Sequence, residues 1–266
     1  MNTFYIRLRL LSPMQIGAGS LGMIEKSLLY IPEKVIWGAF TNTLTQMLYG
    51  TPAAEDYVTV GNAVYSGRIS SFFPELENIR YIPNIPERCW IAENNNSKSI
   101  PFAEMNSLLM TSVTSTALDS ERVSAGTGTL HAVDLINYFY KDWRNEEIKQ
   151  MNFSGYMELP EKICDIKIDG EVIKKIFACS RIGGSRKRGW GRCMVEKVAL
   201  EQYENFSFLS FPGGKLLTAD HEFDCSQKVC GEIRLISRRE YDAEKGSGRK
   251  FASAKLFWST GSVIYD

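Results

Sequence analysis

Alternating apolar and polar side chains predict a half-buried strand at the start of the chain. In the run from Phe4 to Leu11, Arg7 and Arg9 alternate with apolar residues, which is the two-residue period of a strand with one face in the core. Pro13 ends this run. A segment punctuated by three glycines follows, so we expect a loop before the next element.

A short strand and a helix are the next predicted elements. Ser27–Ile31 forms a brief apolar run that Pro32 breaks. Through Lys34–Tyr49 the apolar residues recur at helical spacing, and Gly50 stands in the position of a C-terminal cap. The opening order is therefore strand, loop, strand, helix.

The middle of the chain is less regular. We expect a strand at Val64–Phe73 and a solvated loop or hairpin tip at Asn94–Ser99. Four prolines break any long element in this region, which we interpret as an irregular insertion near 51–125: Pro74, Pro83, Pro86 and Pro101.

The second half returns to strand and helix patterns. We expect strands at Gly128–Tyr140, Asn152–Glu158 and Cys193–Leu200, and a helix at Ile163–Cys179 whose first half is weakened by Gly170. The predicted elements of the tail are a turn at Pro212–Gly214, a strand at Glu232–Ser237, a polar loop at Glu240–Lys250 and an extended end at Lys255–Tyr265.

Composition and charge then limit the function. A chain of 266 residues with 44% hydrophobic and 23% charged residues can bury a core and should be globular. Lys plus Arg and Asp plus Glu both number 31. Because the net charge is zero, the molecule as a whole does not attract a polyanion, and any nucleic-acid site must be local.

Neither a membrane nor a cofactor is indicated. The N-terminus lacks the basic and apolar regions of a signal peptide, and no apolar stretch approaches the length of a membrane span. We expect a cytoplasmic protein whose six cysteines are reduced. Cys225 and Cys230 beside His221 come nearest to a metal cluster, but a fourth ligand is not evident, so no metal is expected.

The strongest chemical signal is a short loop before the strand at Cys193. It carries five cations and no acid, in contrast to the neutral chain around it. Glycines permit positive φ and close backbone approach, arginines bind phosphate through two parallel hydrogen bonds, and a tryptophan offers a face for a base. The loop residues are Arg181, Gly183, Gly184, Ser185, Arg186, Lys187, Arg188, Gly189, Trp190, Gly191 and Arg192.

Two interpretations of this loop stay open. It binds single-stranded RNA by phosphate contacts and stacking, or it is an exposed basic loop in which glycines make turns and Trp190 packs into the core. Dinucleotide and P-loop motifs are absent, and the loop leads into a strand where those motifs need a helix.

Three stretches resemble the RAMP superfamily of CRISPR-associated proteins. Gly183–Arg192 is similar to the family's glycine- and arginine-rich loop, Leu11–Ala39 to its opening, and Gly126–Leu135 to a later strand that follows a flexible loop. Glu33 and Lys34 stand where the family's opening turn has Gly-Ser, so the turn departs from the usual form.

The resemblance implies an α+β, ferredoxin-like (RRM-like) fold. It covers residues 1–200, with the insertion near 51–125 inside it, and leaves 201–266 as a reduced, β-rich C-terminal region. It also implies a non-catalytic subunit of a CRISPR effector ribonucleoprotein that takes part in antiviral defence. The partners would be the guide RNA (crRNA) and other effector subunits, especially a backbone RAMP subunit.

Within the superfamily three roles remain. A guide-processing endoribonuclease would need a histidine, and the chain has only His131 and His221, neither in the first helix. A backbone subunit that cuts target RNA would use an acid in the loop after the first strand, and Glu25 is the only acid in the corresponding Gly17–Ser27 loop. The ending Thr260–Tyr265 resembles that of subunits which cap the 5′ handle of the guide, and this favours the capping role.

Other basic and aromatic residues are secondary candidates. Arg7 and Arg9 would extend the RNA surface if their strand face is exposed, and are otherwise solvated strand charges. A second basic group has interleaved acids, which favour a salt-bridged loop: Arg238, Arg239, Arg249 and Lys250. Phe72, Phe73 and Trp90 would contact a neighbouring subunit if exposed, or else fill the core. A protein-binding scaffold that never contacts RNA is the alternative from another class.

Overall fold

The structure is a computed structural model of the chain. It describes residues 1–116, 118–119, 124–125, 130–142, 146–204, 206–211, 214–242 and 246–265. At residues 95–97, 118–119, 124–125, 237–242 and 246–253 it describes the backbone alone.

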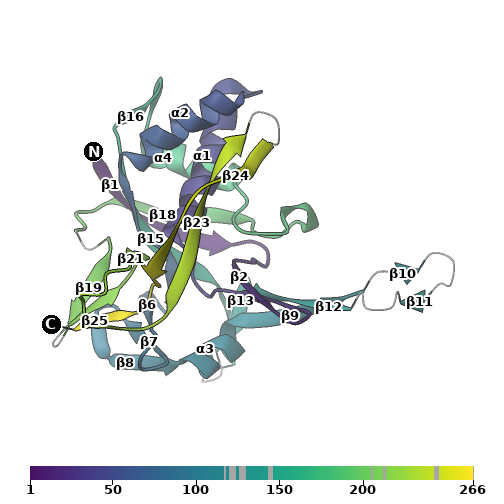
Figure 1. Cartoon of the computed structure of the whole chain (residues 1–266), viewed down its shortest axis with the longest axis vertical. Helices are drawn as coiled ribbons and strands as arrows, with labels where there is room; N and C mark the ends of the chain where they lie inside the picture. The colour runs from purple at the N-terminus through teal and green to yellow at the C-terminus, as the bar shows by residue number, and fades with distance from the viewer. Residues whose placement is uncertain are drawn as a thin grey trace.

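The central sheet has the ferredoxin-like order (Figure 1). Strand β18 (Cys193–Leu200) pairs with β1 (Asn2–Leu10), β1 with β15 (Asn152–Leu159), and β15 with β5 (Phe73–Leu76) and with β4 (Arg68–Ile69), all antiparallel. The chain order is strand, helix, two strands, helix, strand, because α1 (Glu33–Tyr49) precedes β4 and α4 (Gly170–Cys179) precedes β18. The predicted α+β, ferredoxin-like fold is confirmed.

The core lies between this sheet and its helices. Along β1 the side chains of Phe4, Ile6, Leu8 and Leu10 are buried, while the intervening residues lie on the other face. On the helical side, the rings of Phe40 in α1 and Phe177 in α4 are 5.9 Å apart. Alternation in β1 and the helical period in α1 therefore bury their apolar residues in the same layer.

The remaining helices and the extensions of the sheet come from the middle of the chain. Helix α2 (Ala54–Tyr65) packs on α1, and its Gly61 carbonyl accepts a hydrogen bond from Trp37 Nε1 at 3.1 Å. The sheet continues from β5 through β6 (Ile79–Asn84), β7 (Cys89–Ala92) and β8 (Asn95–Pro101), and α3 (Phe102–Leu109) follows.

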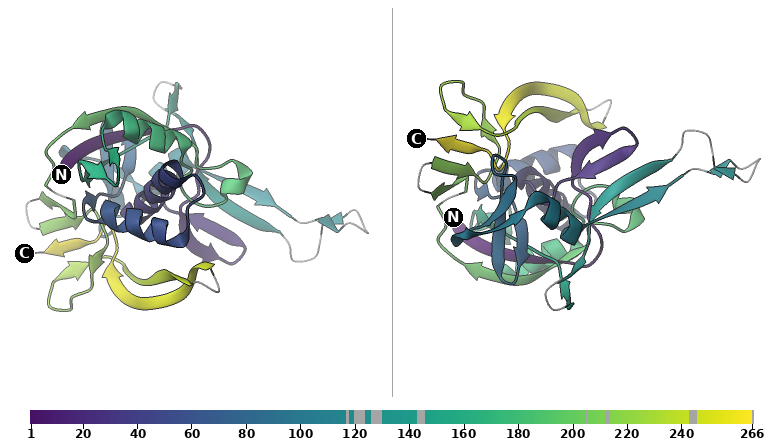
Figure 2. Two further views of the ribbon diagram at one scale, coloured as in Figure 1. Left: turned by 90° about the horizontal axis from the view of Figure 1, so that it is seen from above. Right: turned by 90° about the horizontal axis from the view of Figure 1, so that it is seen from below.

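A hairpin arm projects from the body in every view (Figure 1, Figure 2). Its sheet joins β2 (Gly17–Leu21), β3 (Ile24–Ser27), β12 (His131–Ile136) and β9 (Met110–Ser115), and the short strands β10 (Leu118–Asp119) and β11 (Ser124–Ala125) lie at its end. Two short two-stranded hairpins complete this half: β13 (Phe139–Lys141) with β14 (Ile148–Gln150), and β16 (Lys162–Ile163) with β17 (Ile166–Lys167).

The C-terminal region, residues 201–266, is made of strands in its described part. One sheet contains β19 (Phe208–Phe211), β20 (Gly214–Leu217), β25 (Val263–Tyr265) and β22 (Val229–Cys230). The other contains β21 (His221–Glu222), β24 (Gly246–Trp258) and β23 (Ile233–Asp242), and its long hairpin crosses the front of the molecule in Figure 1.

Several predicted elements are wrong. The strand expected at Ser27–Ile31 is not formed there; the strands in this part of the chain are β2 and β3, which end at Ser27. The residues of the strand expected at Val64–Phe73 are divided between α2, β4 and β5. The helix expected from Ile163 begins only at Gly170, because Asp169 caps it by accepting the Val172 N–H at 3.0 Å.

The polar loop expected at Glu240–Lys250 is also wrong, since β23 and β24 extend into it. Phe72, Phe73 and Trp90 are all buried, which confirms their core role. Residues 126–129 of the Gly126–Leu135 resemblance, residues 212–213 of the turn at Pro212–Gly214 and the basic side chains at 238, 239, 249 and 250 lie outside what is described.

Candidate nucleic-acid interface

The loop at 181–192 is docked on the segment that follows β1. The N–H of Gly184 donates to the carbonyl of Gln15 and the N–H of Gly191 to that of Pro13, both at 2.8 Å. At the closing end, the Leu11 N–H donates to the Arg192 carbonyl at 2.9 Å. The loop is therefore held by the 11–15 segment along its length.

Two glycines are required by this docking. Gly183 has φ +89°, and a Cβ there would collide with the Gln15 carbonyl oxygen. Gly191 has φ +77°, and a Cβ there would collide with the Ile182 carbonyl oxygen. Glycine is needed at both positions because of contacts within the protein. The presence of these glycines is therefore no independent evidence that an RNA backbone approaches the loop closely.

The basic side chains face solvent. A 3₁₀ turn, η1 (Arg186–Arg188), presents three of them together, and Gly189 ends it in a left-handed conformation. All five loop cations are exposed, and among the described residues none has an acidic partner within salt-bridge distance: Arg181, Arg186, Lys187, Arg188 and Arg192. The loop thus keeps its positive charge available.

Backbone donors lie beside these cations. In the described part of the chain, the N–H groups of Ser185, Arg186 and Lys187 donate to no protein acceptor. Trp190 is half-buried, and the Arg188 guanidinium lies 5.3 Å from its ring centroid. Trp190 was expected either to offer an open ring face to a base or to pack into the core. It does neither fully, because its ring is half-buried and the Arg188 guanidinium covers one face.

A groove runs between the loop and α1. Arg181, Arg186 and Lys187 form a basic wall, and the amides of Asn42 and Gln46, one helical turn apart, lie on the opposite wall. Cations and amides together can bind a phosphate and the hydrogen-bonding edge of a base. The sequence did not single out these two amides, because isolated polar residues on a helix are typical of a solvated face.

Gln15 joins the loop to Glu25. Its side chain is 6% exposed, donates from Nε2 to Glu25 at 2.8 Å and accepts from the Ser185 hydroxyl at 3.1 Å. Glu25 itself is exposed on β3. Among the described residues, no three His, Cys, Asp or Glu side chains gather as a metal site requires.

The two strand arginines differ from the loop cations. Arg7 forms an ion pair with the buried Glu75 and donates to Asn78 at 2.8 Å. Arg9 donates to Met194 Sδ at 3.0 Å and has no acidic partner in the described part of the chain. Arg7 is paired and only 19% exposed, so it is neither an open cation nor a solvated strand charge. Arg9 is partly buried without an acidic partner among the described residues, and contact of either arginine with RNA stays a prediction.

Both histidines lie on strands outside the loop. His131 Nε2 is 3.0 Å from the Ser115 hydroxyl, across the β9–β12 pair. His221 lies on β21 in the C-terminal region. All six cysteines are free, with Cys89 and Cys193 buried and the other four exposed.

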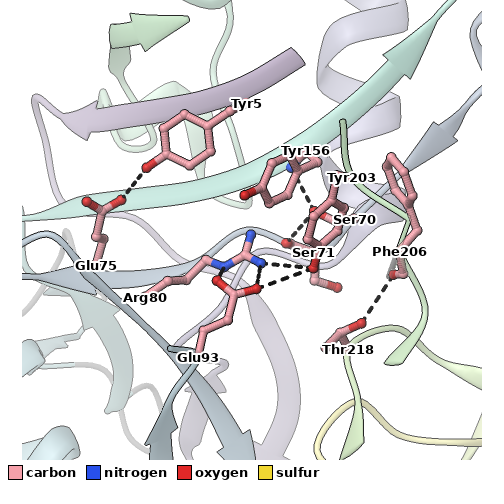
Figure 3. Close-up of polar contacts among 10 residues, drawn as sticks. All are labelled: Tyr5, Ser70, Ser71, Glu75, Arg80, Glu93, Tyr156, Tyr203, Phe206 and Thr218. Carbon is pink, nitrogen blue, oxygen red and sulfur yellow. Dashed lines mark hydrogen bonds and ion pairs between the residues drawn. The ribbon is translucent and has the colours of Figure 1, made fainter. Parts of the chain in front are cut away.

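The helix-free face of the central sheet is occupied by the C-terminal region (Figure 3). Tyr203 stacks on Tyr156 with ring centroids 3.6 Å apart and planes 5° apart, in the way a base would stack. Its hydroxyl accepts from Arg80 at 3.0 Å, and Arg80 is ion-paired with Glu93. Burial raises the pKa of Tyr156 and of Tyr203, so both hydroxyls remain neutral.

This coverage matters for RNA. RRM-type domains stack bases on aromatic residues of the equivalent face. Here Tyr203 takes that place, and Arg80, 6% exposed, is committed to Glu93. The loop and the groove, by contrast, provide an open basic surface.

The ending Thr260–Tyr265 has a structural role. Gly261, at φ +92°, accepts the Ile85 N–H at 2.8 Å and donates to the Leu217 carbonyl at 2.8 Å. Thr260, Ser262 and their neighbours are buried. This turn joins the C-terminal sheets to the β6–β7 connection.

The geometry thus defines a ferredoxin-like domain with an open basic loop and a covered sheet face. No protein-family model matches the chain, and the comparison with curated proteins gives no match. None of the helices in the described residues is long and apolar enough to span a bilayer.

Solved structures do resemble it. A chain of the type III-B Cmr-beta complex bound to cognate target RNA and AMPPnP aligns with a TM-score of 0.59 at 12% identity, over 98% of this chain and 86% of that one. A chain of Cmr-beta bound to cognate target RNA gives 0.56 at 12% identity, with the same coverage. At this identity the likeness shows a common fold, and it is the fold that the RAMP resemblance implied.

Proposed function

We propose that this chain is a non-catalytic, RNA-binding subunit of a CRISPR effector ribonucleoprotein, in which the 181–192 loop binds the guide RNA. One observation carries the proposal. Five exposed cations without acidic partners among the described residues lie on one loop, which is hydrogen-bonded to the 11–15 segment, in a chain whose net charge is zero. Exposed, unneutralised cations are what phosphate binding requires.

The structural neighbours support this context. The similar chains belong to type III-B complexes that were solved with target RNA. A subunit of that kind would contact the guide RNA and neighbouring effector subunits in the cytoplasm. The two open arginines of the groove wall, Arg181 and Arg186, would neutralise phosphates while Asn42 and Gln46 bind a base.

The finer role that we favour is capping of the 5′ handle. It is supported by the resemblance of Thr260–Tyr265 to the ending of capping subunits. Because this turn is buried, its contribution would be to fix the C-terminal sheets, and the RNA contacts would come from the loop. A backbone role is the second candidate, since the exposed Glu25 carboxylate is joined to the loop through Gln15.

Filter binding tests the role. Purified protein is mixed with labelled guide RNA that carries or lacks its 5′ handle, beside an Arg186→Ala/Arg188→Ala variant. Tighter binding to the handled RNA that the variant weakens supports capping, and equal affinity for both RNAs favours a backbone subunit. Cleavage that Glu25→Gln abolishes would overturn the non-catalytic assignment. Absence of binding to either RNA would favour the scaffold alternative.

A further inference from the structure

Two adjacent aromatic rings are exposed outside the loop. Tyr138 and Phe139 are 37% and 41% exposed, and their ring centroids are 4.7 Å apart at 85°. Tyr138 follows β12, and Phe139 is the first residue of β13, at the base of the hairpin arm. Exposed aromatic pairs of this kind are uncommon unless a partner covers them, because burial of such rings is favourable.

The pair lies next to the segment that carries the loop. Met14 and Ile136 exchange backbone hydrogen bonds at 3.0 and 2.8 Å. The Gln150 side chain donates to the carbonyls of both Leu10 and Tyr138, which places the aromatic pair beside the end of β1. The loop contacts this same stretch of chain, because the Leu11 N–H donates to the Arg192 carbonyl.

Among the described residues, the pair has exposed apolar neighbours, and the lysines beside it are paired with acids. In the β13–β14 hairpin, Phe139 lies opposite Gln150, on the face that also carries Ile148, which is 74% exposed. Lys141 is on this face too, opposite Ile148, and forms an ion pair with Glu146 at 3.6 Å. On the other face, Lys149 is paired with Asp142 at 2.8 Å and with Glu77 at 2.9 Å. Phosphate is therefore not the ligand that this patch favours; an apolar, flat group is.

We propose that Tyr138 and Phe139 stack an unpaired base of the RNA whose phosphates the loop binds. This inference rests on the proposed function, and it names a second contact within the same surface. Arg192 and the rest of the loop would bind phosphates on one side of the 11–15 segment. The aromatic pair would hold a splayed-out base on the other side.

A neighbouring protein subunit is the competing occupant of this patch. Continuity with the basic loop favours RNA, because loop and pair share one supporting segment. A base also needs a flat ring face and no charge, which Phe139 supplies. The two occupants differ in a measurable way, since only a stacked base links these rings to RNA affinity in the isolated protein.

The test measures affinity for a short fluorescein-labelled single-stranded RNA by anisotropy. Phe139→Ala should weaken binding by about 5- to 150-fold, the range that stacking energies of 1–3 kcal/mol per base imply. Phe139→Tyr keeps the ring and should retain affinity. Tyr65→Ala, which removes a ring that is 76% exposed on α2, is the matched control and should have no effect.

A second measurement uses the unmodified protein. RNA with 2-aminopurine scanned along its length should show one position whose fluorescence changes on binding, and Phe139→Ala should abolish that change while Phe139→Tyr keeps it. Unchanged affinity and fluorescence in Phe139→Ala, with weaker binding in Arg186→Ala/Arg188→Ala, would overturn this inference alone. No RNA binding by the unmodified protein would overturn the proposed function as well.

Discussion

The salt dependence of RNA binding gives a quantitative test of the loop. Each phosphate neutralised on a single strand contributes a slope of about 0.7 to the fall of log affinity with log salt. If all five exposed cations of the 181–192 loop engage phosphates, we expect a slope near 3.5, about five times 0.7. Between roughly 50 and 200 mM salt, affinity should then fall by about 100-fold.

Removing two cations changes that slope by a predictable amount. In Arg186→Ala/Arg188→Ala the slope should drop to about 2, and affinity should fall by only about 20-fold over the same salt range. The assay is fluorescence anisotropy titration of labelled RNA at four or more salt concentrations. The slope, unlike a single Kd, counts ionic contacts and is insensitive to a small loss of active protein.

The control removes equal charge elsewhere. Lys162 and Lys167 lie opposite each other in the exposed β16–β17 hairpin, apart from the loop. Lys162→Ala/Lys167→Ala should leave the slope unchanged, although the net charge changes equally. A slope near zero in the unmodified protein, or equal slopes in the loop variant and the unmodified protein, would refute phosphate binding by these arginines.

Two further predictions concern stability. Gly191→Ala should destabilise the fold by more than the ~1–3 kcal/mol of left-handed strain alone, because the new Cβ also collides with the Ile182 carbonyl. Gly189→Ala, at φ +84°, places its Cβ in open space and should cost only the strain. Equal losses of unfolding free energy in urea for the two variants would contradict this. Burial is the largest cause, and repulsion from Asp220 the second, of a raised pKa for the Glu33 carboxyl in the folded protein. The folded state therefore binds the proton more tightly than the unfolded state, and the free energy of unfolding falls as pH rises from the ordinary carboxyl pKa to the raised one. Glu33→Gln should therefore raise the Tm at pH 7, and the gain should shrink as pH falls below the ordinary carboxyl pKa; a gain independent of pH would exclude this cause.

Local sequence patterns predicted the elements whose apolar and polar residues follow a regular period. The period of two in β1 and the apolar run of β18 gave strands that the structure contains, with β18 at the predicted Cys193–Leu200. Helix α1 follows from its spacing of apolar residues. Patterns failed where tertiary contacts decide: α2 is stabilised by packing on Trp37, and β23 and β24 extend through a polar stretch because they pair with each other.

The loop divides in the same way between sequence and structure. Its concentration of five cations and its glycines are visible in the sequence, and so is the contrast with a neutral chain. Which glycines are needed for docking on Pro13 and Gln15 is not visible, because those contacts join residues about 170 positions apart. The groove amides of Asn42 and Gln46 are likewise brought to the loop only by the fold.

The sequence by itself determined β1, β15 and β18 of the ferredoxin-like sheet and the basic loop, because strand periodicity and local charge are properties of neighbouring residues. Only the tertiary structure decided which surface is open. Tyr203 reaches back to cover Tyr156, Arg7 is neutralised by Glu75, and the loop cations remain unpaired among the described residues. These outcomes depend on contacts between segments far apart in the chain, whose distances no local pattern contains.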